Sequence, residues 1–178
     1  MRIVSGELRG RRFDPPESFE ARPTTDFAKE NIFNVLCNII DFEDVKVLDL
    51  FSGSGSISYE FASRGCKDIT CVEKNRLHHR FIVKTAEHFG ISDVMRILNG
   101  DALKFIASTN EKYDIVFADP PYAMKEVDEL PDLVMSRGIV REGGVFILEH
   151  SVAGRFNKHE KFWQTRAYGK VNFTFFKA

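Results

Sequence analysis

The sequence predicts an α/β protein in which helices cover both faces of a mostly parallel sheet. Short β-rich segments alternate with segments of helical length through the middle of the chain, a pattern typical of βαβ units. Two extended segments near the C-terminus surround Gly169 and Lys170, which indicates an antiparallel hairpin. The chain has 178 residues, 43% hydrophobic and 29% charged, so one globular domain with a sizeable core is expected.

Residues 1–25 are predicted to form an extension, and residues 26–178 the globular domain. The segment Arg2–Phe13 reads as a small hairpin that turns at Gly6 or Gly10, and a proline-containing loop follows it. This extension is too short to bury a core of its own. A helix is expected from about Asp26 to Ile40, because apolar residues recur there at helical spacing, namely Ala28, Ile32, Val35, Leu36 and Ile39.

Five β-rich segments are expected to form the parallel part of the sheet, and a helix over residues 75–89 separates the second from the third. The segments are Val45–Leu50, Asp68–Glu73, Val94–Leu98, Tyr113–Asp119 and Gly144–His150. Ligands of such sheets bind beyond the carboxyl ends of the strands. Acidic residues lie at or just beyond four of these ends: Asp49, Glu73, Asp101 and Asp119.

A glycine-containing loop, residues 49–56, follows the first strand and precedes a helix. Gly53 and Gly55 permit backbone conformations closed to other residues and let a ligand approach the main chain. A Walker loop is excluded because no Gly-Lys-Ser/Thr follows, and a dinucleotide fingerprint would have a glycine at position 58, where Ser58 stands. Asp49 would also repel a pyrophosphate.

The acids at the strand ends favour a cationic ligand without phosphate, such as S-adenosylmethionine. Asp49 could attract its ammonium and sulfonium groups while the loop packs beneath them. Glu73 is placed to accept hydrogen bonds from both ribose hydroxyls, and Asp101 could accept one from the adenine amino group.

Asp119, Pro120, Pro121 and Tyr122 directly follow the fourth strand. Prolines cannot belong to a central strand, because each lacks an N–H, so one interpretation is a stiff loop. The other is a clamp for an exocyclic amine, a poor nucleophile because its lone pair is delocalised into the ring of the base. Asp119 and the carbonyl of Pro120 would accept hydrogen bonds from the amine, and Tyr122 would stack on an extruded base.

The formal net charge of −1 provides no global basic field, so contact with a nucleic acid must come from a local patch. Arginines with glycines among them precede the sheet, and arginine contacts phosphates and stacks on bases. Acidic residues in the same segment offset much of this charge, so a merely solvated hairpin is the alternative.

No metal site, membrane segment or secretion signal is expected. The three cysteines form no CxxC spacing, and His78 and His79 are adjacent, so on a helix they diverge by about 100° and are interpreted as solvated. The N-terminus is too polar for a signal peptide, and no apolar segment approaches the ~20 residues of a membrane span. We expect a cytoplasmic protein that acts as a monomer.

Several motifs resemble class I S-adenosylmethionine-dependent methyltransferases: residues 49–55, Ser63-Arg-Gly, Val72-Glu73, Gly100-Asp101 and Asp119-Pro-Pro-Tyr122. With four N-terminal motifs added, the chain is similar to a narrower group, the bacterial small-subunit rRNA guanine-N2 methyltransferases of the ribosomal small-subunit methyltransferase D family. These motifs are Ser5-Gly6, Arg9-Gly-Arg-Arg12, Arg22-Pro-Thr-Thr-Asp26 and Glu30-Asn-Ile-Phe-Asn34. The resemblance covers nearly the whole chain.

The resemblance implies a class I methyltransferase (Rossmann-like) fold, a seven-stranded and mostly parallel sheet with a C-terminal antiparallel hairpin and an N-terminal β-hairpin extension. It implies methyl transfer from S-adenosylmethionine, leaving S-adenosylhomocysteine, to N2 of one guanine in 16S rRNA of the small ribosomal subunit. The implied catalytic residues are Asp119, Pro120, Pro121 and Tyr122. The implied cofactor-binding residues are Asp49, Phe51, Ser52, Gly53, Ser54, Gly55, Glu73, Lys74, Asp101, Ala102 and Asp119, and the implied RNA-binding residues are Arg9, Arg11, Arg12, Arg22 and Thr24.

Three other functions stay open at this point. An adenine-N6 methyltransferase acting on DNA or RNA would use the same clamp, and no residue reads guanine unambiguously. A dehydrogenase would bind a nicotinamide cofactor instead. A non-catalytic RNA-binding module would retain affinity for RNA but transfer no methyl group, and the intact clamp argues against it.

Overall fold

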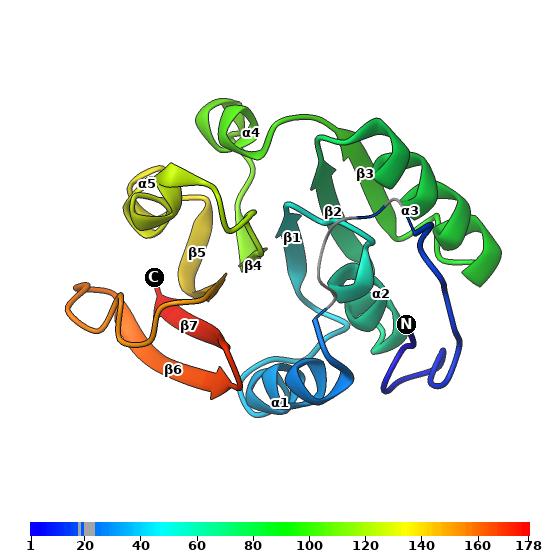
Figure 1. Ribbon diagram of the computed structural model, residues 1–178, viewed down its shortest axis with the longest axis horizontal. Coiled ribbons are helices and arrows are strands. Elements are labelled where there is room, and N and C mark those ends of the chain that lie inside the picture. Colours follow the sequence, from blue (N-terminus) through cyan, green and yellow to red (C-terminus); the bar gives the residue numbers. More distant parts are fainter. Residues whose placement is uncertain (18, 20–23) are drawn as a thin grey trace.

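The computed structural model describes residues 1–17, 19 and 24–178 of the chain (Figure 1). Seven strands form one sheet in the order β3-β2-β1-β4-β5-β7-β6. The strands are β1 (Lys46–Leu50), β2 (Asp68–Glu73), β3 (Met95–Asn99), β4 (Tyr113–Ala118), β5 (Val140–His150), β6 (Phe162–Tyr168) and β7 (Val171–Lys177). The predicted strands are confirmed to within a residue at most ends, but β5 begins at Val140, four residues before the predicted start at Gly144.

The strand order places a ligand crevice in the middle of the sheet. Strands β3, β2, β1, β4 and β5 are parallel, while β7 runs antiparallel to both β5 and β6. From β1 the chain moves to one side of the sheet through β2 and β3, and then returns to the other side of β1 at β4. Open α/β sheets bind ligands at such a switch point, beyond the carboxyl ends of the strands. The predicted seven-stranded fold with its C-terminal hairpin is confirmed.

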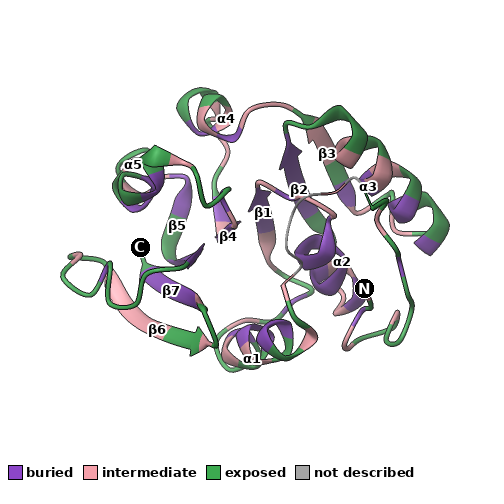
Figure 2. Cartoon of the chain, in the orientation of Figure 1, coloured by how far each residue is buried: buried purple, intermediate pink, exposed green. Residues whose placement is uncertain are grey.

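Helices cover both faces of the sheet, and each face has its own apolar layer. The α-helices are α1 (Asp26–Cys37), α2 (Ser56–Ser63), α3 (Arg76–Phe89), α4 (Ala102–Ser108) and α5 (Leu130–Ser136), and a short 3₁₀ helix, η1 (Lys125–Asp128), precedes α5. Helices α1 to α3 lie on one face, and α4 and α5 on the other (Figure 1). The central strands between these layers are almost entirely buried (Figure 2).

Helix α1 is shorter than predicted, and its buried face differs. It ends at Cys37 rather than near Ile40, so Ile39 lies beyond it and is 41% exposed. Val35 is only half-buried, whereas Lys29 and Phe33 are buried completely. Helical spacing of apolar residues could not identify Lys29, because a lysine is buried only where the rest of the fold supplies partners for its charge.

The N-terminal hairpin has one isolated β-bridge, between Arg2 and Arg12, instead of two regular strands, and backbone hydrogen bonds on either side of the bridge connect its two arms. Gly6 and Gly10 both have φ of 82°, which explains why either could be the turn. Gly6 lies against the end of α2, where a Cβ atom would come within 1.8 Å of the carbonyl oxygen of Ser63. Ile3 and Phe13 are buried in the apolar layer beneath α1 to α3. The division at residue 25 stays a prediction.

None of the helices that the structure describes is long and apolar enough to cross a membrane. Within the same residues, no group of three or more His, Cys, Asp or Glu side chains is arranged to hold a metal ion.

Candidate active site

A cleft of about 1230 Å³ opens beyond the carboxyl ends of β1, β2, β4 and β5. All four residues of the predicted clamp line it: Asp119, Pro120, Pro121 and Tyr122. Ten of the predicted cofactor-binding residues line it as well: Asp49, Phe51, Ser52, Gly53, Ser54, Glu73, Lys74, Asp101, Ala102 and Asp119. The sequence-predicted residues therefore meet in one hollow, as the strand-end rule requires.

Gly55 is the predicted cofactor residue that does not line the cleft. It adopts φ of 81° as the N-cap of α2, and a Cβ atom there would come within 2.6 Å of the ring of Tyr59. The glycine is therefore required by the packing of Tyr59 and by the turn, and not by the approach of a ligand. At Gly53, with φ of 55°, the nearest atom to an added Cβ lies 3.9 Å away, so the space above this residue is open.

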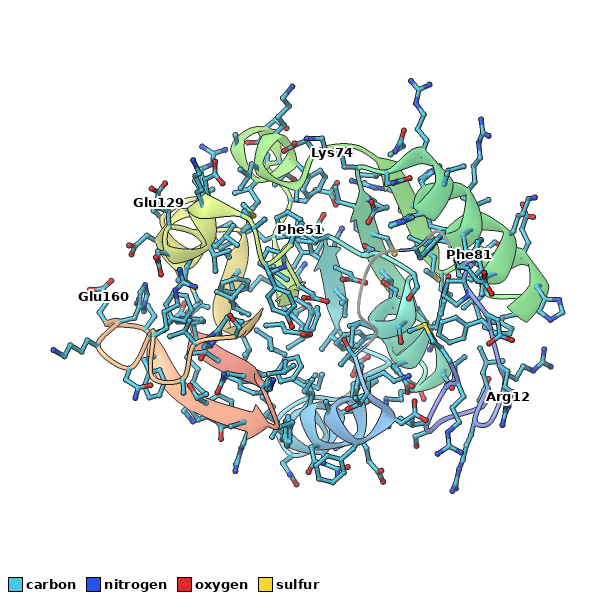
Figure 3. All side chains as sticks on the ribbon, in the orientation of Figure 1. Arg12, Phe51, Lys74, Phe81, Glu129 and Glu160 are labelled. Carbon is cyan, nitrogen blue, oxygen red and sulfur yellow. The ribbon has the colours of Figure 1, made fainter. Side chains whose placement is uncertain are left out.

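The glycine loop is tied to both neighbouring strands. The hydroxyl of Ser52 donates to the carbonyl oxygen of Asp49 at 2.8 Å, and its N–H donates to the carbonyl oxygen of Val72 at 3.1 Å. Phe51, at the centre of Figure 3, has φ of 59°, the only positive value at a non-glycine residue in the described chain. Strained backbone of this kind is uncommon and concentrates at binding sites, because the surrounding structure must hold it.

Glu73 connects the loop to the start of α3. One carboxylate oxygen accepts a hydrogen bond from the N–H of Gly53 at 2.7 Å, and the other accepts one from the N–H of Asn75, also at 2.7 Å. A carboxylate has about four lone-pair directions, so both oxygens can still accept from a ligand. Glu73 thus orients the loop in addition to any contact with a ribose.

Asp101 is the N-cap of α4, and its side chain is largely occupied. One oxygen accepts from the N–H groups of Leu103 and Lys104, and the other accepts from Nζ of Lys74 at 3.0 Å. The hydrogen bond from Lys74 is the main reason that the pKa of Asp101 is lowered. The ion pair with Asp101 also neutralises Lys74 at the edge of the cleft.

Asp49 is a buried carboxyl, with 2% of its surface exposed, at the floor of the cleft. The hydroxyl of Ser58 donates to it at 2.5 Å. Burial is the largest cause that raises its pKa to about 7, the Ser58 hydrogen bond opposes the rise, and the negative charges of Asp119 and Glu73 add to it. A cationic ligand above Asp49 would favour the ionised form and bind more tightly because of it.

The clamp residues project from the end of β4. Pro120 is buried, whereas Tyr122 is 59% exposed at the mouth of the cleft. The carboxylate of Asp119 accepts no hydrogen bond and forms no salt bridge among the described residues. Burial, followed by the charge of Glu149, raises the pKa of Asp119 well above its ordinary value. Asp119 therefore has its acceptor positions available to a ligand.

Glu149, near the end of β5, is a site residue that the sequence analysis missed. Only 5% of its surface is exposed, it lines the cleft, and the hydroxyl of Thr24 donates to it at 3.3 Å. Burial is the main cause that raises its pKa to about 7. The strand-end rule that selected Asp119 applies equally to the next strand, so the signal was present in the sequence.

Phe19 and His78 form another part of the cleft wall that the sequence did not indicate. Their rings stack with centroids 3.8 Å apart, and both residues line the cleft. Nδ1 of His78 lies 3.8 Å from a carboxylate oxygen of Glu73. The interpretation of His78 and His79 as solvated is wrong, since both are half-buried and Nε2 of His79 lies 3.3 Å from the carbonyl oxygen of Ile97.

The predicted RNA-binding residues are not gathered at the cleft. Arg9, Arg11 and Arg12 are exposed on the N-terminal hairpin, and Arg12 lies at the edge of the molecule, well away from Phe51 (Figure 3). Arg22 lies outside the described residues. Thr24 lines the cleft and contacts Glu149.

The residues present fit S-adenosylmethionine. The side chains of Asp49, Glu73, Asp119 and Glu149 make the cleft acidic, which suits a sulfonium and an ammonium and would repel a pyrophosphate. The hydroxyl oxygen of Ser56, in the first turn of α2, is buried in the cleft and has no hydrogen-bond partner among the described residues. A polar ligand would satisfy it.

The strand order, the acidic cleft at the switch point and the Asp-Pro-Pro-Tyr turn together define a class I methyltransferase. Residues 1–177 match the family model described as Conserved hypothetical protein 95. Ribosomal RNA small subunit methyltransferase D of Escherichia coli (strain K12) is 32% identical over 152 residues, 85% of this chain and 75% of that protein. The chain belongs to this family, that of the ribosomal small-subunit methyltransferase D proteins.

Solved structures agree in fold over the whole chain. The yhhF protein of Escherichia coli superposes with a TM-score of 0.85 at 27% identity, covering 99% of this chain and 97% of that one. A hypothetical protein of Thermus thermophilus also gives a TM-score of 0.85, at 26% identity, covering 100% of this chain and 99% of that one.

Proposed function

We propose that this protein transfers a methyl group from S-adenosylmethionine to N2 of a guanine in 16S rRNA of the small ribosomal subunit. The observation that carries the proposal is the turn after β4, which presents the carboxylate of Asp119 to an acidic cleft at the switch point of the sheet. Family membership supports the choice of rRNA, since the curated relative is named for the small subunit. The protein would act as a cytoplasmic monomer.

Residues of the turn after β4 would hold the guanine and orient its N2 amine for methyl transfer. S-Adenosylmethionine supplies, when bound, a methyl group on a sulfonium. Asp119 and the carbonyl of Pro120 accept hydrogen bonds from the N2 amine, which fixes the direction of its lone pair. Methylation of N2 would make this nitrogen acidic, and Asp119 would accept the proton that it releases. The ring of Tyr122 stacks on the extruded base.

Transfer of labelled methyl to unmodified small subunits and to free 16S rRNA tests this proposal. Mass spectrometry of the digested nucleosides should show N2-methylguanosine, and the two substrates show whether assembly is needed. N6-methyladenosine as the product would replace the proposal with the adenine alternative. RNA binding without any transfer would instead indicate a non-catalytic RNA-binding module.

A further inference from the structure

A second, smaller cavity lies beside the cleft, between the start of α1 and the turn that joins β6 to β7. Its volume is about 290 Å³. Thr24, Tyr122 and Glu149 line both hollows, so the cavity and the cleft meet at the clamp. Sites for small molecules usually have about 300–1,000 Å³, so this cavity has room for a single base rather than for several nucleotides.

The walls of the cavity suit a nucleotide. Phe27, in the first turn of α1, is 65% exposed, and its ring meets that of Tyr168 at 89° with centroids 5.6 Å apart. Tyr122 contributes a further exposed ring. Lys170, in the turn between β6 and β7, is exposed and forms no salt bridge within the described part of the chain. Rings that can contact a base therefore lie beside a cation that can contact its phosphate.

Two carboxylates stand side by side where the cavity joins the cleft. Ala118 of β4 pairs with Leu148 of β5, so Asp119 and Glu149 follow next to each other. The hydroxyl of Thr24 donates to one oxygen of Glu149, and neither acid has a salt-bridge partner among the described residues. A buried carboxylate is costly without donors, so this pair favours a ligand that presents two adjacent N–H groups.

We propose that this cavity receives the target guanine and that Glu149 distinguishes guanine from adenine; the inference rests on the proposed function. The Watson–Crick edge of guanine presents the N1–H and N2–H donors next to each other. Glu149 accepts from N1–H while Asp119 and the carbonyl of Pro120 accept from N2–H. Adenine has a lone pair at N1, which would face the carboxylate of Glu149 without a hydrogen bond. The specificity therefore comes from the ionised carboxylate of Glu149, which only accepts hydrogen bonds and which the N1–H of guanine stabilises in that form.

The test compares guanine with 2,6-diaminopurine, which keeps the N2 amine but has a lone pair at N1. Small subunits are reconstituted with 16S rRNA that carries either base at the methylated position, which is first mapped with the wild-type protein. Single-turnover methyl transfer by the wild type should favour guanine by about 10- to 100-fold. Glu149→Gln should slow transfer to guanine and reduce this preference, because the glutamine amide can donate to N1 of 2,6-diaminopurine.

The matched control is Glu142→Gln, at an exposed glutamate on the opposite end of β5, which should keep the wild-type preference. Calorimetry with S-adenosylmethionine verifies that each variant is folded. Equal transfer to the two bases by the wild type would overturn the inference, and this result needs no variant. An unchanged preference in folded Glu149→Gln would also overturn it, since a purely structural role predicts slower transfer to both bases. If the wild type methylates neither base, the proposed function itself fails, and the inference fails with it.

Discussion

At the residue scale, Asp119 and Tyr122 lie at opposite ends of one turn. Replacing each with alanine should impair a different step of methyl transfer. Asp119→Ala removes an acceptor that matters most as the amine loses its proton, so single-turnover transfer should fall by about 10²–10⁴-fold. Tyr122→Ala removes a stacking surface of about 1–3 kcal/mol per base, so productive placement of the guanine should suffer. Single-turnover methyl transfer to small subunits, over a range of subunit concentrations, separates the two effects.

Two controls belong to this pair of variants. Tyr122→Phe keeps the ring and should reduce transfer only mildly. Both alanine variants should still bind S-adenosylmethionine in calorimetry, with a modest loss of affinity where the methionine moiety lies beside the changed residue. Near-normal transfer by Asp119→Ala would rule out the proposed mechanism, even though the fold and the family would be unaffected.

Protonation of the Asp49 carboxyl should make the free energy of unfolding depend on pH. Its pKa is raised to about 7 in the folded protein, mainly by burial, so the folded state holds this proton more tightly than the unfolded chain does. The resulting stabilisation is complete below about pH 4 and is lost as the pH rises through about 7. Asp49→Asn cannot ionise, so its free energy of unfolding should fall less than that of the wild type between about pH 5 and pH 8, by at most about 3 kcal/mol.

Urea unfolding of both proteins at several pH values measures this difference. Asp119 and Glu149 also have raised pKa values and contribute the same sign, but they are present in both proteins, so the comparison isolates Asp49 together with its interaction with Asp119. Parallel pH profiles for wild type and Asp49→Asn would show that Asp49 does not ionise in this range.

At the scale of elements, a buried ion pair joins α1, α2 and the N-terminal hairpin. Nζ of Lys29 lies 3.3 Å from a carboxylate oxygen of Glu60 and donates to the carbonyl oxygen of Arg2 at 2.6 Å, and the same oxygen of Glu60 accepts from the N–H of Val4. Lys29→Met would leave Arg64, 3.5 Å from the other carboxylate oxygen, as the remaining cation beside the buried Glu60, so the free energy of unfolding should fall by up to about 3–5 kcal/mol. Urea unfolding measures the loss.

The matched control for this pair is Lys84→Met, at an exposed lysine of α3, which should stay within about 0.5 kcal/mol of the wild type. If Lys29→Met lowered the free energy of unfolding no more than Lys84→Met does, the buried ion pair would not stabilise the contact between the hairpin and the two helices.

At the scale of the whole molecule, the acidic side chains of the cleft and the arginines of the N-terminal hairpin form two separate charged regions. The net charge is −1 and the cleft is acidic, so we propose that the hairpin arginines supply much of the attraction to RNA. Changing Arg9, Arg11 and Arg12 together to alanine should weaken RNA binding. The slope of log affinity against log salt should fall by roughly 0.7–0.9 for each phosphate that the variant no longer neutralises. Affinity for S-adenosylmethionine should not change.

A variant with the same change of charge at exposed lysines elsewhere, Lys104, Lys125 and Lys158, separates a local interaction from the overall charge. Salt titrations of RNA binding by both triple variants are the measurement. Equal slopes in the two would indicate that the hairpin is only structural.

The sequence by itself determined the strands, the class of fold and most of the cleft. Strand and helix patterns are local, and the ends of parallel strands must meet at one edge, so Asp49, Glu73 and Asp119 could be placed together without coordinates. The turn after β4 was also readable, because proline restricts the backbone wherever it occurs.

Only the tertiary structure decided the features that depend on residues far apart in the chain. Thr24 and Glu149 are 125 positions apart, and no local pattern predicts that the hydroxyl of Thr24 contacts this carboxylate. Lys29 is buried because α2 supplies Glu60, and Gly55 is needed for the packing of Tyr59 rather than for a ligand. Burial and charge pairing follow from which surfaces pack against each other, and that is a property of the assembled sheet and helices, not of any segment alone.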